Sequence, residues 1–221
     1  DDSDNDRDAL ALGRLLAFSG AELSLAYVRH AQLEEEAREA LAEQQAEELL
    51  ERGAASIGAP DMPRHVVVNA STSEGLEELA KREKADIVVF GSAYRTADGL
   101  VKPGIAAHKL LLGGPAAIAV APAGLRSRPS VSVNTIGVID EGDEAARATA
   151  ESLAATLGAS VRDGAEGPID FLVVGSRPEA QPGRVTLSAS SDYAVEAATY
   201  PVMVVPRGVT IPFTAPQAQT V

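Results

Sequence analysis

The chain has 221 residues, of which 19 are Lys or Arg and 32 are Asp or Glu, giving a formal net charge of −13. Such an acidic surface repels phosphate backbones and anionic lipid headgroups, so neither nucleic acid nor a membrane is expected as a partner. The absence of Cys excludes disulfide scaffolds, thiolate metal sites and cysteine nucleophiles.

Predicted helices and strands alternate through residues 1–125. Apolar residues recur at helical spacing from Leu10 to Phe18, and the segment AELSLAYV alternates as a strand does. Ser71 and Glu74 have the spacing of a capping box, which indicates the start of a helix. In chain order the predicted elements are helix 10–18, strand 21–28, helix 33–52, strand 65–70, helix 71–84, strand 85–92, helix 106–112 and strand 116–121.

This alternation predicts an α/β fold. Parallel strands need long crossover connections, and helices usually supply these and cover both faces of the sheet. We therefore expect a doubly wound parallel sheet in residues 1–125. A Ser-, Arg- and Pro-rich stretch at 126–132 is the predicted linker.

The same order of elements returns after the linker. TIGVID at 135–140 is a predicted strand, and an Ala-rich helix is predicted over 144–157. The segment IDFLVVGS at 169–176 repeats ADIVVFGS at 85–92. The chain is therefore predicted to contain an internal duplication.

The second copy is shorter than the first. Gly158 matches Gly20 and Gly175 matches Gly91, but the interval between the matched glycines is far shorter in the second copy. The missing length corresponds to about two strands and two helices between the first helix and the late strand, which predicts a reduced half-domain with a marginal core. The expected parts are a first domain at 1–125, a second at 133–208 and a tail at 209–221.

Gly and small polar residues follow the predicted strands in both copies. In parallel α/β sheets, ligands lie beyond the carboxyl ends of the strands. A loop of Gly and hydroxyl residues can surround phosphate oxygens with backbone N–H groups. The candidate positions are Asp1, Val28, Gly91 and Ser92 in the first copy and Asp140, Gly175 and Ser176 in the second.

These motifs resemble the universal stress protein family. The first copy reads D-x-S at Asp1 and Ser3, then A-E-L-S-L-A-Y-V and A-D-I-V-V-F-G-S. The second reads V-I-D, I-D-F-L-V-V-G-S-R and Y-P-V-M-V-V-P-R, so the resemblance is to a tandem member and covers nearly the whole chain. It implies an adenine nucleotide α-hydrolase-like fold, with a five-stranded parallel sheet in the order 3-2-1-4-5.

The resemblance also implies a nucleotide site. Many members bind ATP through G-x2-G-x9-G-[S/T], an Asp after the first strand and a backbone contact at the end of the second. By position this implies cofactor-binding roles for Asp1, Val28, Gly91, Ser92 and Gly104 in the first copy, and for Asp140, Gly175 and Ser176 in the second.

Both copies depart from the ATP pattern. In the first, Tyr94 replaces the second Gly and Ile105 the hydroxyl residue. Bulk at a glycine position hinders close approach of the backbone to phosphate, and Pro also removes a donor. The second copy keeps only the first Gly, has Pro178, Ser188 and Ala189 at the other positions, and is expected to lack the strand that would cover the adenine. ATP is thus a candidate cofactor of the first copy, and no other is expected.

The resemblance also bears on strands at both ends of the first copy. The family's central first strand ends just before the position of Asp1, so we expect about six to eight further native residues upstream. Members commonly dimerise through their last strands. Here this implies pairing of 116–121 with 202–205 within one molecule, and a homodimer is left open.

Other acidic residues are better explained without a ligand. Asp2, Asp4 and Asp6 begin like a calcium loop, but the Gly and Glu that such a loop requires are absent, so we interpret them as acids at a helix start. The three His residues lack metal-ligand spacing. Asp86 and Asp170 precede buried strands and are interpreted as strand-start caps.

Three functions are weighed. The leading one is a non-catalytic, cytoplasmic stress-response protein that acts through contacts with an unidentified protein and has a degenerate nucleotide site. The alternative is an ATP-binding sensor that uses the first copy, with slow hydrolysis at most. A nucleotide-dependent ligase or pyrophosphatase would need S-G-G-x-D-S after the first strand, where this chain has D-D-S-D-N-D.

Overall fold

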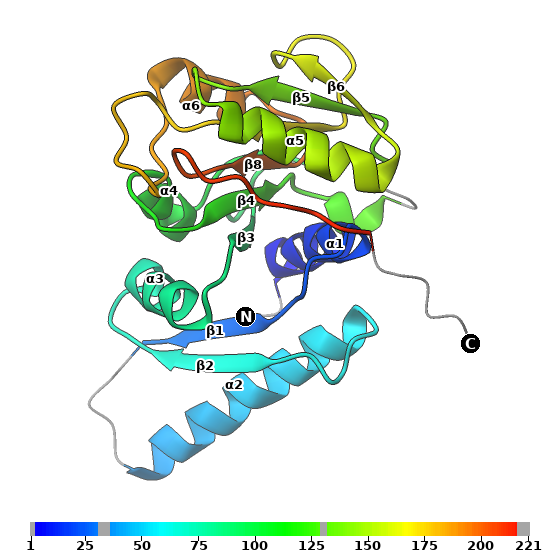
Figure 1. Cartoon of the computed structure of the whole chain (residues 1–221). Coiled ribbons are helices and arrows are strands. Elements are labelled where there is room, and N and C mark those ends of the chain that lie inside the picture. Colours follow the sequence, from blue (N-terminus) through cyan, green and yellow to red (C-terminus); the bar gives the residue numbers. More distant parts are fainter. Residues whose placement is uncertain (1–2, 31–35, 129–131, 216–221) are drawn as a thin grey trace.

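The structure, a computed structural model, describes residues 3–30, 36–128 and 132–215 (Figure 1). Its helices are α1 (Asp4–Phe18), α2 (Glu36–Ser56), α3 (Thr72–Glu83), α4 (Ile105–Leu111), α5 (Glu144–Leu157) and α6 (Ala189–Glu196), with a short 3-10 helix η1 (Leu125–Ser127). Its strands are β1 (Leu25–Arg29), β2 (Arg64–Val68), β3 (Ile87–Gly91), β4 (Ala117–Ala121), β5 (Thr135–Ile139), β6 (Ser160–Asp163), β7 (Phe171–Val174) and β8 (Val202–Val204).

The strands form two sheets. β1 and β2 pair in parallel, and the larger sheet has six strands in the order β3-β4-β8-β7-β5-β6. Neighbours in the larger sheet are parallel, except that β4 and β8 run antiparallel. The predicted α/β class is confirmed, but the larger sheet is mixed and not purely parallel.

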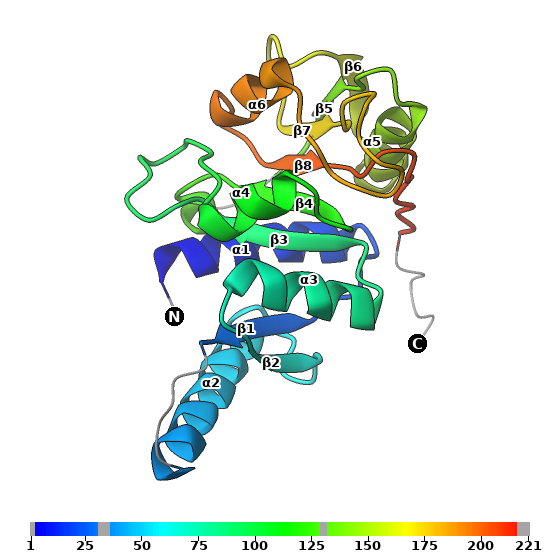
Figure 2. The ribbon, with the colours of Figure 1, turned by 90° about the vertical axis from the view of Figure 1, so that its left-hand side faces the viewer.

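The expected continuous sheet of the first copy is not formed by the described residues. In the order 3-2-1-4-5, the central strand would lie between β1 and β3, and no described strand takes that place. β3 therefore lies at the end of the larger sheet, and β1 belongs to the separate pair. Helix α3 contacts β1, β2 and β3, so it packs across the two sheets where strand pairing does not join them (Figure 2).

The second copy contains a strand that the sequence did not predict. β6 lies between α5 and β7 in the chain and pairs in parallel with β5 at the edge of the larger sheet. The expectation that this copy had lost every strand between its first helix and its late strand is therefore wrong. The segment SVRD was missed because it is short and its only apolar residue is Val161, which gives no alternation to detect.

β4 and β8 join the two copies into one sheet. Their register pairs Ile118 with Val204, Ala119 with Met203 and Val120 with Val202. These are the segments whose pairing the resemblance implied. All the residues in this ladder are buried, so β4 and β8 form the centre of the sheet and not an edge.

Side-chain caps determine where the helices begin. Ser3 and Asp6 form a reciprocal capping box, so α1 begins well before the predicted 10–18 segment. Asp4 and Asp6 lie in the first turn, where acids complement the free N–H groups of a helix. Ser71 caps α3, as its capping-box spacing predicted.

Two apolar clusters cover the two faces of the larger sheet. One joins α1 and α5 through residues such as Leu16, Leu153 and Phe171, and the other joins α4 and α6 through residues such as Leu110 and Val195. Both clusters also take residues from β4, β7 and β8. The two copies therefore share their cores, and the small second copy is stabilised by the first.

The segment expected to be a tail is packed in its first part. Ile211 and Phe213 are buried in the cluster beneath α1 and α5. The N–H of Ile211 donates to the Thr149 hydroxyl at 3.0 Å, and that of Phe213 donates to Ser152 Oγ at 2.7 Å. Residues 209–215 therefore form a strap along α5 that ends beside the carboxyl end of α1, where the backbone of Thr214 meets Gly20.

Candidate functional site

The structure brings together only part of the predicted first-copy site. Gly91 ends β3, Ser92 follows it, and Gly104 precedes α4, with a bridge between Ser92 and Pro103. Val28 lies in β1, on the separate two-stranded sheet, and strand pairing does not connect it to these residues. Asp1 lies outside the described residues.

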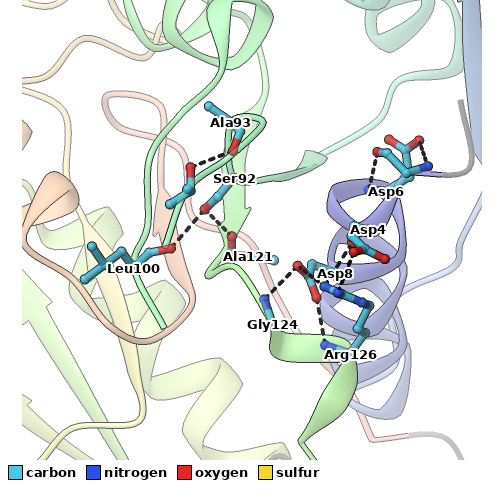
Figure 3. Close-up of polar contacts among 11 residues, drawn as sticks. Asp4, Asp6, Asp8, Ser92, Ala93, Leu100, Ala121, Gly124 and Arg126 are labelled. Carbon is cyan, nitrogen blue, oxygen red and sulfur yellow. Dashed lines mark hydrogen bonds and ion pairs between the residues drawn. The ribbon is translucent and has the colours of Figure 1, made fainter. Parts of the chain in front are cut away.

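The Ser92 hydroxyl is buried and is used by the fold (Figure 3). Its Oγ donates to the carbonyl of Ala121 at 2.7 Å, with the carbonyl of Leu100 also in reach at 3.2 Å. The same oxygen accepts the N–H of Lys102 at 3.1 Å. Both its donor and an acceptor position are therefore engaged by the chain itself.

Ser176 repeats this arrangement in the second copy. Its buried Oγ donates to the carbonyl of Val205 at 2.7 Å and accepts the N–H of Thr186 at 3.1 Å. Ser176, Thr186 and Val205 correspond to Ser92, Lys102 and Ala121 of the first copy, and the sequence offset is the same for all three pairs. The two serines thus tie the loop after one strand to the end of the neighbouring strand, and neither hydroxyl points to an open site.

The two matched glycines are required by packing of the chain on itself. A Cβ at Gly91 would collide with the carbonyl oxygen of Asn5, and one at Gly175 would collide with that of Asp140. Neither position has room for a side chain. The close approach that glycine permits here is therefore to backbone of the same protein.

The starts of α4 and α6 differ. Gly104 caps α4 without any side-chain hydrogen bond, whereas Ser188 caps α6 by accepting the N–H of Ser191 at 3.1 Å. The first residue of α4, Ile105, is 83% exposed, and Tyr94 in the preceding loop is 77% exposed. The two residues that break the ATP pattern in the first copy therefore place large side chains in solvent.

Glu141 is a polar residue of this region that sequence reasoning missed. Its carboxylate accepts hydrogen bonds from the hydroxyls of Ser188 and Ser191 at the start of α6. Its backbone has a φ of 52°, in the left-handed region that L residues rarely adopt. The carboxylate thus supplies the anion that a helix N-terminus favours. The Asp-Glu-Gly turn was the only sequence signal.

Asp140 also acts within the chain. One carboxylate oxygen accepts the N–H of Gly142 at 3.1 Å, and the other lies 3.6 Å from the guanidinium of Arg147. Arg147 also pairs with Asp163 at the end of β6, and mainly this hydrogen bond raises the pKa of Arg147 above its usual value. The predicted nucleotide contact Asp140 is therefore part of a surface ion-pair cluster.

A buried carboxylate was also missed in α1. Asp8 is 1% exposed, and its oxygens accept the N–H groups of Gly124 and Arg126, each at 2.8 Å, together with Arg126 Nη1 at 3.0 Å (Figure 3). Asp143 makes the matching contact in the second copy, accepting the N–H of Gly208 at 2.7 Å. These carboxylates cap the turns that follow β4 and β8.

The strand-start interpretation is confirmed for one of its two residues. Asp170 Oδ2 accepts the N–H groups of Asn134 and Thr135, at 2.8 and 3.0 Å, and so links the start of β7 to that of β5. Asp86, at the corresponding position of the first copy, has no such side-chain partner among the residues described.

A small hollow lies between α4 and α6. Its volume is about 110 Å³, below the roughly 300–1,000 Å³ of pockets that enclose drug-sized ligands. Its lining residues are His108, Leu111, Leu112, Leu187, Ser188, Ala189 and Asp192. It therefore has room for a side chain but not for a nucleotide.

Metal ligands and membrane-spanning helices are both absent from the described part of the chain. Within 3–30, 36–128 and 132–215, no three His, Asp or Glu side chains converge as metal ligands. None of the helices in the same ranges is both long enough and apolar enough to cross a bilayer. His30 instead makes a local contact, in which its ring nitrogens face the carbonyl of Ala70 and the hydroxyl of Thr72. Asp2 lies outside the described residues.

Comparison with solved structures shows the fold. A universal stress protein from Archaeoglobus fulgidus matches with a TM-score of 0.62 and 13% identity, over 92% of this chain and 93% of that one. A putative universal stress protein from Pseudomonas aeruginosa matches with a TM-score of 0.55 and 12% identity, over 87% and 95%. A protein of unknown function from the same species matches with a TM-score of 0.56 and 13% identity, over 90% and 87%.

The sequence was also compared with curated proteins and with models of protein families, and one family model matches. No curated protein matched the chain. The sequence model described as the universal stress protein family matches residues 1–111, which is half of the chain, and includes β1 to β3 and α1 to α4. The chain therefore belongs to the universal stress protein family.

Proposed function

We propose that the protein is a tandem universal stress protein that acts without catalysis, through protein contacts, and that the nucleotide positions of both copies now serve the fold. The tandem arrangement is supported by the contacts of Ser92 and Ser176, whose donors and acceptors recur at one constant offset in the sequence. It is also supported by the matching turns held by Asp8 and Asp143.

The observation that carries the proposal is the use of the loop hydroxyls inside the protein. Ser92 and Ser176 each donate to a backbone carbonyl at 2.7 Å, so neither has a proton left for a phosphate oxygen. A hydroxyl has a single donor, and breaking a buried hydrogen bond to engage a ligand costs about 1–3 kcal/mol. In the second copy, the carboxylate of Glu141 adds a fixed negative charge at the start of α6.

A thermal-shift titration with Mg·ATP tests the proposal. A ligand present at 100 times its Kd stabilises a native protein by about 2.7 kcal/mol, which is readily seen as a rise in melting temperature. We expect no specific rise up to millimolar Mg·ATP, with Mg·GTP and sodium sulfate as controls for ionic strength. A saturable rise with ATP alone would contradict the proposal.

One observation favours the alternative of an ATP sensor in the first copy. Gly104 leaves the N–H groups at the start of α4 without a side-chain cap, unlike Ser188 at α6. Backbone N–H groups at the start of a helix can bind an anion. If the sensor is correct, ATP stabilises the wild-type chain, and Gly104→Ser abolishes the effect because the new hydroxyl caps the helix.

A further inference from the structure

The outward sides of α4 and α6 carry several large exposed side chains. Ile105 is 83% exposed, Tyr193 75% and Leu112 65%, and both helices lie on the face turned to the viewer in Figure 2. We call this surface the α4–α6 face, and it comprises Ile105, Lys109 and Leu112 from α4 and its end with Asp192, Tyr193 and Glu196 from α6. Apolar side chains gathered on one surface of a soluble protein commonly mark an interaction site.

The α4–α6 face includes part of the small hollow between the two helices, at Leu112 and Asp192. The hollow of about 110 Å³ runs between the two helices, with Leu111 and Leu112 on one side and Ala189 on the other. An aromatic or aliphatic side chain from a partner fits such a space. A face with projecting apolar side chains and a small hollow has the shape that interface hot spots require.

The charges on this face are divided between the two helices. α4 carries His108 and Lys109 in its last turn, whereas α6 carries Asp192 in its first turn and Glu196 at its end. Lys109, Asp192 and Glu196 have no ion-pair partner among the residues that the structure describes. One side of the face is therefore basic and the other acidic, and the face is complementary to itself.

We propose that the α4–α6 face binds a second copy of this chain, with α4 of each molecule lying over α6 of the other. A two-fold axis in the plane of the face, midway between the helices, brings α4 of one molecule opposite α6 of its partner. Lys109 then lies over the acidic side of the partner's α6, and this contact occurs twice around a centre formed by Ile105, Leu112 and Tyr193. An arrangement of α4 on α4 would oppose like charges and is disfavoured.

The central strands β4 and β8 are not available for self-association. β4 and β8 pair with each other inside the chain, from Ile118↔Val204 to Val120↔Val202, so neither offers an edge to another molecule. Dimerisation through these strands would require the two copies to separate. The α4–α6 face needs no such rearrangement, because its apolar residues are already exposed.

Charge reversal with rescue tests the proposal in the full chain. Sedimentation equilibrium of the wild-type chain is expected to show a dimer, at twice the 22.8 kDa of the monomer. Lys109→Glu and Glu196→Lys should each weaken the dimer by about tenfold or more, since each places two like-charge contacts in the interface. The double variant K109E/E196K restores opposite charges and should recover most of the affinity.

Two further variants distinguish an effect on this interface from a general effect of charge or of stability. Glu151→Lys makes the same charge change on an exposed position of α5 and should leave the dimer intact. Tyr193→Ser should weaken the dimer without lowering the melting temperature of the monomer, because the side chain is exposed.

Two results would overturn the proposal, and a third would overturn its geometry. A monomer at all concentrations, or a dimer that neither single charge reversal weakens, would show that this face is not the interface. Failure of the double variant to recover would contradict the placement of α4 over α6. None of these results depends on whether ATP binds, so the dimer and the proposed function are tested separately.

Discussion

The two copies agree closely in their last parts and differ in their first parts. From β3 to the turn after β4, the main contacts recur in the second copy at one constant offset, including those of the buried hydroxyls of Ser92 and Ser176. Between the first helix (α1 or α5) and the late strand (β3 or β7), the first copy has β1, α2, β2 and α3, whereas the second has only β6. The hydroxyl contact thus persists even in the copy that has lost most of the ligand pattern. This persistence supports the proposal that the contact serves the sheet and not a nucleotide.

The helix starts show the opposite behaviour. Ser188 and Ser191 in the second copy correspond to Gly104 and Ala107 in the first, and only the serines bind an internal carboxylate, that of Glu141. In the second copy, the start of α6 is therefore capped by hydroxyls and a carboxylate of the chain itself. In the first copy, the start of α4 has no side-chain cap. The corresponding loops of the two copies thus differ in how the following helix begins, so matched positions in the two loops can be mutated and compared.

The largest expected effect concerns the buried carboxylates. Asp8→Ala leaves two backbone N–H groups without their acceptor and removes one of the two carboxylates that pair with Arg126, and we expect a loss of about 2–4 kcal/mol. Asp143→Ala should cost less, about 1–2 kcal/mol, because Asp143 mainly caps α5 and holds one further N–H. Urea unfolding measures both. Equal losses would show that the additional contacts of Asp8 do not make it more important than Asp143, which lies 3.9 Å from the guanidinium of Arg207.

The matched hydroxyls are expected to have matched effects. Ser92→Ala and Ser176→Ala should each lower the free energy of unfolding by about 1–3 kcal/mol, because each leaves a buried carbonyl without its donor and a part-buried N–H without its acceptor. The two losses should agree within the error of urea unfolding. If Ser92→Ala were nearly neutral for stability but altered a response to Mg·ATP, the hydroxyl would belong to a ligand site after all.

Glu141 gives a smaller effect that distinguishes the copies. Glu141→Ala should cost about 1–2 kcal/mol, because the buried Ser191 hydroxyl loses its acceptor. Glu141→Gln should cost about half as much, since the amide oxygen still accepts from both hydroxyls. Glu166→Ala, on an exposed loop, is the control. A cost for Gln equal to that for Ala would mean that charge alone, and not hydrogen bonding, stabilises the start of α6.

The smallest effect is a pH dependence that arises between the copies. Glu77 on α3 pairs with Lys81 at 2.8 Å and with Arg184 of the second copy at 3.1 Å. Chiefly the hydrogen bond from Lys81, with help from Arg184, lowers the pKa of Glu77 below its usual 4.5. A lowered pKa stabilises the fold above about pH 4.5, and this stabilisation is lost as the pH falls through the lowered value.

Glu77→Gln measures that contribution. The variant should lose about 0.2–1 kcal/mol at pH 7 and less at a second, acidic pH below the lowered pKa of Glu77, where the wild-type carboxyl is itself protonated. Urea unfolding at the two pH values gives the comparison. A loss that is the same at both pH values would show that the charge of Glu77 does not stabilise the fold.

The sequence was sufficient for the parts of the fold that have strong local signals. The continuous apolar runs of β3 and β7 and the capping box of Ser71 predicted their elements correctly. Helix α1 began earlier than predicted because its first turn is polar and is held by the Ser3–Asp6 cap. β6 was missed because four residues with one apolar side chain carry no period.

The candidate site was less accessible to sequence reasoning. Gly91 and Ser92 were found at the right place, at the end of β3, but their partners Asn5 and Ala121 are distant in sequence, so their structural use was invisible. Asp8 looked like one acid among many, because nothing local shows that it is buried against Gly124. Burial and long-range contact decide the role of a polar residue, and neither can be read from spacing alone.

The loops after β3 and β7 use their glycines and hydroxyls within the fold, and the stoichiometry of Mg·ATP binding to the wild-type chain is the sharpest test of that use. Equilibrium dialysis with radiolabelled nucleotide measures it. We expect no bound ATP per chain up to millimolar concentration. Saturable binding of one ATP per chain, weakened by Gly104→Ser, would contradict this use for the first copy, and binding of two would contradict it for both.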